Sequence, residues 1–237
     1  MRVLVTRPQP GASRTMRGLQ ELGFEPVLLP LTETVTLPVA SNAAGDNVAA
    51  VAITSANAVR HAPKELISAL AALPCHAVGH RTAEAARAAG FLAVSEGPGD
   101  AEKLGEAIAA GLSGKAIVYL TGRVRFPAFE ARLREAGVEV RAIETYDTVS
   151  LNYSDDEIRA RLSGQPVDAV LLYSAKAAAA LLALANRAEL RDLFEKTQAF
   201  ALSGRIASAF GDVAGKNIRV AREPLEEALL ELLHGGD

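Results

Sequence analysis

Hydroxyl, amide and basic side chains follow several apolar runs of this sequence, at points where a β-strand would end. Thr54, Ser55 and Asn57 come directly after "VAAVAI", and Ser174 follows "VDAVLLY" in nearly the same way. Backbone N–H groups at the start of a helix, together with guanidinium and ammonium groups, bind anionic oxygens. The pattern predicts a site for a large polyanion between two domains. The other candidate binding residues are Arg7, Gly79, Arg81, Thr82, Gly122, Arg123, Ala175, Lys176, Ser203 and Arg205.

The alternative explanation of the hydroxyl and amide groups is structural. Ser and Asn are favoured at helix N-caps because they accept a hydrogen bond from the first turn. For Ser55 or Asn57 considered alone, capping is the simpler explanation. The recurrence of such residues favours binding, because the ligand of an open α/β sheet lies outside the carboxyl ends of the strands.

The composition and the missing motifs argue against several other function classes. The net charge is −3, Trp is absent and aromatic residues make up 5%, so no basic field or base-stacking platform for nucleic acid is expected. "GPGDAEKLG" lacks the third glycine of a dinucleotide site, and "GLSGKA" lacks the spacing of a P-loop. Cys75, the single cysteine, is expected to be a small buried hydrophobe. His76, His80 and Glu84 are not expected to share a metal, because His76 lies in an expected strand. We therefore expect no cofactor and no metal.

Short β-branched runs alternate with Ala- and Leu-rich segments of helical period along most of the chain. "TMRGLQELG" and "FEARLREAGV" each carry an apolar stripe at helical spacing and a closing glycine. Such alternation predicts parallel sheets that are covered by helices on both faces. The expected strands are Val3–Thr6, Pro26–Leu29, Val48–Thr54, Cys75–Val78, Leu92–Ser95, Ala116–Leu120, Glu139–Glu144, Asp168–Tyr173, Ala199–Leu202 and Ile218–Ala221.

The chain contains an internal repeat. Residues 3–31 resemble residues 116–146, and residues 48–112 resemble residues 167–233. One segment of each kind together supplies five strands, which is one flavodoxin-like sheet. The repeat by itself leaves two arrangements open, namely tandem domains or a second domain inserted into the first.

The two connecting segments favour the inserted arrangement. "LTETVTLP" and "TYDTVSLN" share an alternating pattern, as two paired strands would. The predicted fold is α/β, with two flavodoxin-like parallel-sheet domains joined by a two-stranded linker in crossed connectivity. The expected boundaries are 1–34 with 150–237 for the first α/β domain, 35–149 for the inserted α/β domain, and 31–38 and 145–152 for the hinge strands.

Several motifs, in this order and spacing, resemble the uroporphyrinogen-III synthase family. They are "VLVTRP", "TSANAV", "VGHRTAEAARAAGF", "TGRVRFPAFEARLREAGVEV", "TYDT" and "DAVLLYSAKAAAAL", and together they cover nearly the whole chain. The resemblance implies the same crossed two-domain fold, with the active site between the domains. It also implies an enzyme, a cyclising hydro-lyase that uses no metal or organic cofactor.

The resemblance further implies the substrate and the chemistry. Such enzymes close the linear tetrapyrrole hydroxymethylbilane, a small-molecule polycarboxylate, to uroporphyrinogen III with loss of water and inversion of ring D. A proton donor helps the hydroxyl to leave, and Tyr146 in "TYDT" matches the tyrosine that the family suggests. A tyrosine hydroxyl keeps its proton at neutral pH and can donate it. The alternative is that Tyr146 packs at the hinge.

Two positions depart from the expected pattern. In "SGRIA", Ile206 stands where a threonine that could bind substrate is expected, so Arg205 or Ser203 is expected to replace that contact. Lys176 is less typical of the family but suits a carboxylate.

A rival interpretation is a non-catalytic two-domain cytosolic binder or sensor of a tetrapyrrole or another polyanion. The apolar run in "MRVLVTRP" is too short for a signal sequence, and the longest one, Ala177–Ala185, is about half a membrane span. We therefore expect a cytoplasmic protein without nucleic-acid or membrane partners. Because no exposed apolar stripe stands out, we expect a monomer.

Overall fold

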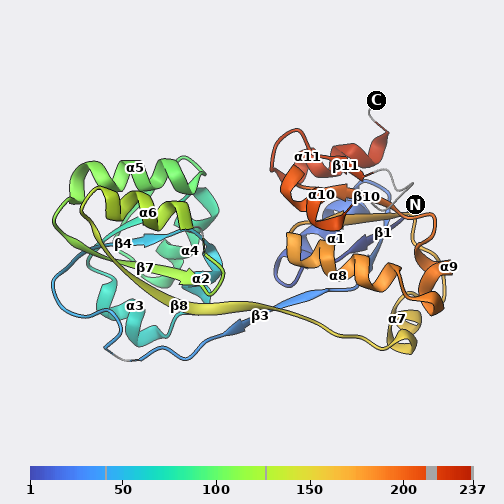
Figure 1. The fold of residues 1–237 in the computed structure, drawn as a ribbon, viewed down its shortest axis with the longest axis horizontal. Coiled ribbons are helices and arrows are strands. Elements are labelled where there is room, and N and C mark those ends of the chain that lie inside the picture. The colour runs from blue at the N-terminus through green and yellow to red at the C-terminus, as the bar shows by residue number, and fades with distance from the viewer. Residues whose placement is uncertain (41, 126, 212–217, 236–237) are drawn as a thin grey trace. The chain divides into compact units, whose positions relative to one another are not determined.

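The computed structural model describes residues 1–40, 42–125, 127–211 and 218–235 (Figure 1). The chain divides into two compact units, which we call unit 1 and unit 2. Unit 1 comprises Met1–Glu33 and Val149–Asp237, and unit 2 comprises Thr34–Thr148.

Unit 1 is built on a five-stranded sheet in the order β11-β10-β9-β1-β2, in which all paired strands are parallel. The strands are β1 (Arg2–Val5), β2 (Glu25–Leu28), β9 (Ala169–Leu172), β10 (Gln198–Ala201) and β11 (Ile218–Val220). The helices are α1 (Gly11–Glu21), α7 (Asp155–Arg161), α8 (Ala175–Ala185), α9 (Arg191–Phe194), α10 (Gly204–Phe210) and α11 (Glu226–Glu231), with short 3₁₀ turns at Ala188–Leu190 and Leu232–His234.

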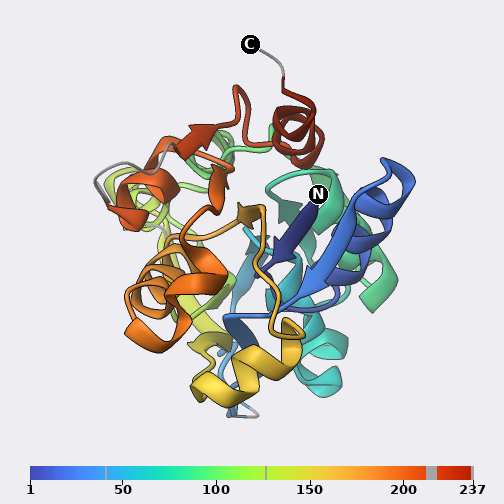
Figure 2. The same ribbon diagram turned by 90° about the vertical axis from the view of Figure 1, so that its right-hand side faces the viewer.

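Alternating apolar residues give this sheet two buried faces. Val3 and Val5 pack with α1 and α11, whereas Leu4 packs on the opposite face with α7, α8, α9 and α10. Successive side chains of a strand point to opposite faces, so a run such as "VLV" must be covered on both sides. Figure 2 shows α1 (blue) and α8 (orange) on opposite sides of the strands of unit 1.

Unit 2 contains most of a six-stranded sheet in the order β3-β8-β7-β4-β5-β6. The strands are β3 (Thr32–Thr36), β4 (Val48–Ile53), β5 (Pro74–Ala77), β6 (Ala93–Glu96), β7 (Ala116–Gly122) and β8 (Glu139–Ser150). One face is covered by α2 (Ala56–Arg60), α3 (Lys64–Leu70) and α4 (His80–Ala89). The other is covered by α5 (Ala101–Leu112) and α6 (Pro127–Glu135). In Figure 1, α5 and α6 lie on one side of β4 and β7, and α3 lies on the other.

The structure confirms the predicted fold class and all ten predicted strands, whose ends differ by one or two residues except in β8. Residues near the N-terminus share a sheet with β9, β10 and β11, so the crossed arrangement is correct and the tandem one is wrong. β8 runs to Ser150, six residues beyond its predicted end. It is longer because its second half is the connector, which pairs with β3 as the alternating pattern predicted.

The repeated strand–helix units end in the same way. Gly23 and Gly137 both have left-handed backbone conformations, with φ of 79° and 76°. Phe24 N–H donates to the Leu19 carbonyl and Val138 N–H to the Leu133 carbonyl, both at 2.9 Å. A residue with a Cβ pays a steric penalty at positive φ, which explains the glycine predicted to close each helix.

The single cysteine behaves as the small hydrophobe that the sequence predicted. Cys75 is 1% exposed in β5, and burial raises the pKa of its thiol to about 12. Among the residues that the structure describes, no helix is both long and apolar enough to cross a membrane.

We predict that a fragment of residues 31–152 folds without the rest of the chain. It keeps the six-stranded sheet and both of its helical covers, so it should unfold cooperatively with a free energy of roughly 5 kcal/mol or more. Urea denaturation followed by circular dichroism measures this. Residues 1–122, a fragment of equal length that cuts both sheets, should show no cooperative transition. A gradual, non-cooperative loss of signal from 31–152 would contradict the independence of unit 2.

Candidate active site

The first group of predicted residues surrounds the end of β4 in unit 2. Ser55 is the N-cap of α2, and its Oγ accepts a hydrogen bond from Asn57 N–H at 3.2 Å. Thr54 Oγ1 lies 2.7 Å from the hydroxyl of Tyr119. The Asn57 side-chain oxygen accepts from Arg60 at 3.3 Å. The capping role of Ser55 is thus real, and its hydroxyl proton is still available to donate to a ligand.

The second group lies at the end of β5. Gly79 is the N-cap of α4, and a Cβ there would lie 3.2 Å from the Cα of Gly99, so the loop carrying Gly99 leaves little room for a side chain. Arg81 is exposed on the first turn of α4, whereas Thr82 is 6% exposed. The turn therefore presents backbone, the Arg81 guanidinium and the His80 imidazole to solvent, with the threonine turned towards the core.

Tyr146 lies on β8, paired in register with Gly122 at the end of β7. A Cβ on Gly122 would lie 2.6 Å from Cζ of the Tyr146 ring, so only glycine allows the ring to rest on this backbone. The ring is half-buried against the apolar face that also packs α2, α3 and α4. Its hydroxyl makes no hydrogen bond to any residue that the structure describes. It is therefore free to donate to a ligand.

Arg123 begins a chain of alternating charges beside Tyr146. Its N–H donates to the Tyr146 carbonyl at 2.9 Å, and its guanidinium pairs with Asp147 at 3.2 Å and with Glu144 at 3.5 Å. The side chain is 57% exposed, so these ion pairs are weak and open to competition by another carboxylate. The chain continues from Glu144 through Arg125, Glu130 and Arg134.

Arg7 occupies a different environment, in unit 1 after β1. Its guanidinium lies 4.1 Å over the ring of Tyr173 and pairs with Glu226 at 3.1 Å, and both charged side chains are less than one-fifth exposed. The Tyr173 hydroxyl donates to Glu226 at 3.0 Å, because burial and the Glu226 charge raise its pKa and keep it protonated. Thr15 also bonds Glu226. Arg7 is therefore already neutralised by a protein carboxylate.

Two more helix starts in unit 1 carry predicted residues. Ser174 is the N-cap of α8 and accepts from Ala177 N–H at 3.1 Å. Ser203 caps α10 without a side-chain bond. Ile206 is 4% exposed and packs in the core, so its side chain does not face solvent. Thr82, at the equivalent position of α4, is similarly buried, with 6% of its surface exposed. The remaining predicted residues here are Ala175 in the first turn of α8, and Lys176 and Arg205, which are exposed.

The parallel strands bring the predicted residues of each unit to one sheet edge. Sequence reasoning missed Tyr119, Tyr173 and Glu226, which hold Thr54 and Arg7. Tyr119 is hidden inside an apolar run, and Glu226 lies far from Arg7 in sequence, so no local pattern marked them.

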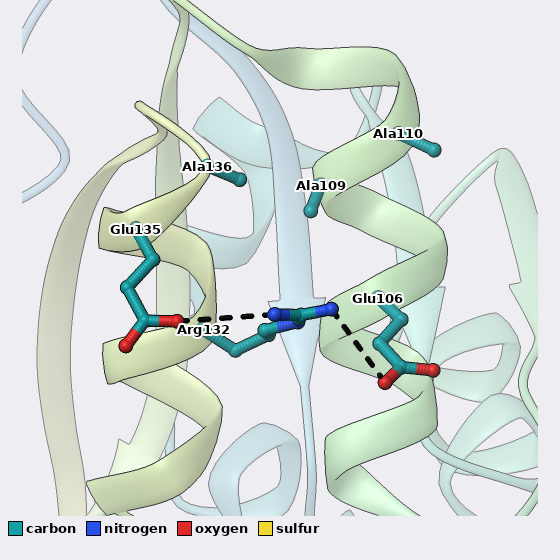
Figure 3. Close-up of a pocket in the computed structure, with 6 residues that line it drawn as sticks. All are labelled: Glu106, Ala109, Ala110, Arg132, Glu135 and Ala136. Atoms are coloured by element: carbon teal, nitrogen blue, oxygen red, sulfur yellow. Dashed lines mark ion pairs between the residues drawn. The ribbon is translucent and has the colours of Figure 1, made fainter.

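Two pockets in unit 2 help to locate the site. The larger, about 580 Å³, lies between α5 and α6 and is lined by Glu106, Ala109, Ala110, Arg132, Glu135 and Ala136. Figure 3 shows Arg132 reaching between Glu106 and Glu135, and none of the predicted site residues takes part. A second pocket of about 360 Å³ includes Arg123 and Glu144 beside the segment 37–40. Of the two, the second adjoins the Tyr146 region.

Fold and site together define a class: a two-unit α/β protein whose strand ends carry backbone N–H groups, hydroxyls and basic side chains. The chain belongs to the uroporphyrinogen-III synthase family, because the family model described as "Uroporphyrinogen-III synthase HemD" matches residues 13–231. Its activity is therefore the closure of hydroxymethylbilane to uroporphyrinogen III, with loss of water and inversion of ring D. The resemblance noted in the sequence is confirmed, and the sensor interpretation is not favoured.

Solved structures support the fold. The uroporphyrinogen-III synthetase of Helicobacter pylori 26695 is 20% identical over 99% of each chain, with a TM-score of 0.67. A mutant uroporphyrinogen III synthase of the extremely thermophilic bacterium Thermus thermophilus is also 20% identical, over 99% of this chain and 96% of that one, with a TM-score of 0.57. No curated protein matches the chain.

We predict that Gly122→Ala lowers the rate of uroporphyrinogen III formation. The added Cβ would lie 2.6 Å from the Tyr146 ring and displace it, at a stability cost of about 1–3 kcal/mol. Turnover and melting temperature are measured together. The control is Gly111→Ala in α5, where a Cβ meets nothing within 4 Å and the rate should not change. A normal rate in Gly122→Ala would show that the ring position is not required.

Proposed function

We propose that Tyr146 is the proton donor of the reaction and that the strand-end donors of each unit bind substrate carboxylates. The observation that carries the proposal is the Tyr146 hydroxyl, which has no hydrogen-bond partner in the described part of the chain although its ring is held against Gly122. A fixed ring with an unused hydroxyl suits proton donation to a bound molecule.

The reaction requires one proton transfer to the departing oxygen. The terminal hydroxyl of hydroxymethylbilane leaves as water when it receives a proton, which we assign to Tyr146. The methylene carbon that remains is electrophilic and bonds to the substituted α-carbon of ring D, which gives a spiro centre. The bond from this centre to the methylene bridge of ring C then breaks, and that methylene bonds to the free α-carbon of ring D, which inverts the ring. The proton lost later from the pyrrole framework restores the tyrosine, so the protein ends unchanged. The other task of the protein is to hold this carbon within bonding reach, which is a matter of position.

Arg123 is the arginine of unit 2 best placed to bind a carboxylate near Tyr146. The ion pairs to Glu144 and Asp147 use Nε and Nη1, and the side chain is largely exposed. A substrate carboxylate can therefore compete for the guanidinium at low cost. Arg81, which is also exposed, supports a second carboxylate contact at the start of α4.

In unit 1 we assign carboxylate binding to Ser174, Lys176, Ser203 and Arg205. These residues lie at the starts of α8 and α10, where backbone N–H groups point outwards. Arg7 contributes only if a substrate carboxylate displaces Glu226.

We also propose that the enzyme works as a cytoplasmic monomer. A mass of two chains in light scattering would contradict the monomer.

Tyr146→Phe is the direct test of the proton donor. With freshly generated hydroxymethylbilane, the type I and type III products are separated and their rates are compared with a control without protein. We expect the variant to keep type III selectivity but to lose roughly 10²-fold or more in rate, as the loss of a general acid does. A wild-type rate would remove Tyr146 from the chemistry, and type I product alone from the wild-type protein would contradict the activity itself.

Ser174→Ala tests whether a capping serine also binds substrate. Loss of the cap should cost about 1 kcal/mol of stability, and loss of the hydroxyl donor should raise KM roughly threefold to tenfold. The matched control is Ser154→Ala, which removes the capping box of α7 outside both strand-end groups. It should cost the same stability and leave KM unchanged. Equal KM values in the two variants would show that Ser174 only caps α8 and does not bind substrate.

A further inference from the structure

A histidine lies against the proposed proton donor and has no role in the mechanism described so far. His61 is the C-cap of α2, and its ring centroid lies 6.0 Å from that of Tyr146, with the planes tilted by 34°. This separation is typical of interacting aromatic rings. His61 Nδ1 also lies 2.8 Å from Oγ1 of Thr36, the last residue of β3. Three elements of unit 2 thus meet at one cluster, which we call the His61 cluster: Thr36, His61 and Tyr146.

The register of β3 on β8 explains why Thr36 reaches this cluster. Two backbone hydrogen bonds set it: Leu37 N–H to the Thr145 carbonyl at 2.9 Å, and Leu151 N–H to the Leu31 carbonyl at 3.0 Å. Both give the same antiparallel alignment, in which residue 36 stands opposite residue 146. Opposite residues project to the same face of an antiparallel pair, with Cβ atoms about 4.5–5.5 Å apart. Thr36 therefore projects from β3 to the face that carries the Tyr146 ring.

The end of α2 is fixed independently of this hydrogen bond. Thr145, the neighbour of Tyr146 on β8, donates from Oγ1 to the Ala58 carbonyl of α2 at 2.7 Å, in a buried position. His61 cannot move away from Tyr146 as part of α2 without breaking this bond. Rotation of its own side chain is the remaining freedom, and the bond to Thr36 restricts that rotation.

We infer that His61 is a positioning residue that, together with Thr36, holds the Tyr146 ring in place. The inference rests on the proposed role of Tyr146 as proton donor. Gly122 contacts the ring from β7, and His61 contacts it from the end of α2, so the ring is restricted by two elements. Burial, and next the charge of Arg60, lowers the pKa of His61, so the imidazole is neutral at neutral pH. It therefore acts by contact and hydrogen bonding and adds no charge beside the donor.

A double-mutant cycle separates this role from a general effect on the fold. His61→Ala and Thr36→Val are each made in the wild-type protein and in Tyr146→Phe, and kcat and KM for type III product are measured. In the wild-type background we expect His61→Ala to lower kcat roughly tenfold to a hundredfold with little change in KM, because the proton donor is misplaced while substrate binding is unaffected. Thr36→Val should also lower kcat, but by a smaller factor. In Tyr146→Phe neither change should lower kcat further, because the hydroxyl that they position is gone.

The matched control is another imidazole–hydroxyl pair of unit 2. His76 Nδ1 lies 2.9 Å from Ser95 Oγ, with the same chemistry as the pair of His61 and Thr36 but on β5 and β6. His76→Ala should leave kcat unchanged.

Each outcome decides a separate point. Equal losses from His61→Ala in both backgrounds, or no loss in the wild-type background, overturn the positioning role. If the melting temperature of His61→Ala is much lower than that of the wild type, the test rests on Thr36→Val, because Thr36 is exposed and its substitution should not unfold the protein. An unchanged kcat in Thr36→Val would then overturn the inference. A wild-type rate in Tyr146→Phe alone instead removes the proton-donor proposal, and the positioning role is withdrawn with it.

Discussion

The structure around the candidate site depends on one strand, β8, which is hydrogen-bonded on both sides. On one side β7 fixes its register and places Gly122 under the Tyr146 ring. On the other side β3 pairs with it, as the connector pattern predicted. A strand with two partners cannot slip by one residue without turning every side chain to the opposite face. Because of this constraint, the sheet fixes the backbone of Tyr146. Only rotation of the Tyr146 side chain remains for His61 and Thr36 to restrict.

The two units repeat one plan with different polar chemistry. Ser55 and Ser174 both cap a helix after a central strand, with φ of −150° in each case. The next helix of each unit begins at Gly79 or Ser203, again in extended conformation. Beyond the caps the units diverge, because only unit 2 carries a tyrosine hydroxyl without a described partner. The shared plan therefore explains where donors occur, and the differences between the units suggest which donors take part in proton transfer.

Much of the fold could be predicted from the sequence, because its signals are local or periodic. Ten strands, the glycines after α1 and α6, and the crossed connectivity all followed from apolar spacing, the internal repeat and the paired connectors. The site could be predicted only in part. Strand ends marked Ser55 and Arg123, but nothing in the sequence around Arg7 indicates that Glu226 neutralises it, or that His61 meets Tyr146. Such contacts join residues far apart in sequence and depend on side-chain packing, which periodicity does not describe.

The two arginines that follow central strands show why residue type alone could not assign roles. Arg123 is more than half exposed and shares weak ion pairs, so a new carboxylate replaces interactions of similar strength. Arg7 is mostly buried between Tyr173 and Glu226, and removing its partner would leave a poorly solvated charge. A carboxylate that displaced Glu226 would have to supply an equally close contact and leave Glu226 solvated elsewhere. The local dielectric environment therefore favours Arg123 for reversible substrate binding and Arg7 for holding α11 against the sheet of unit 1.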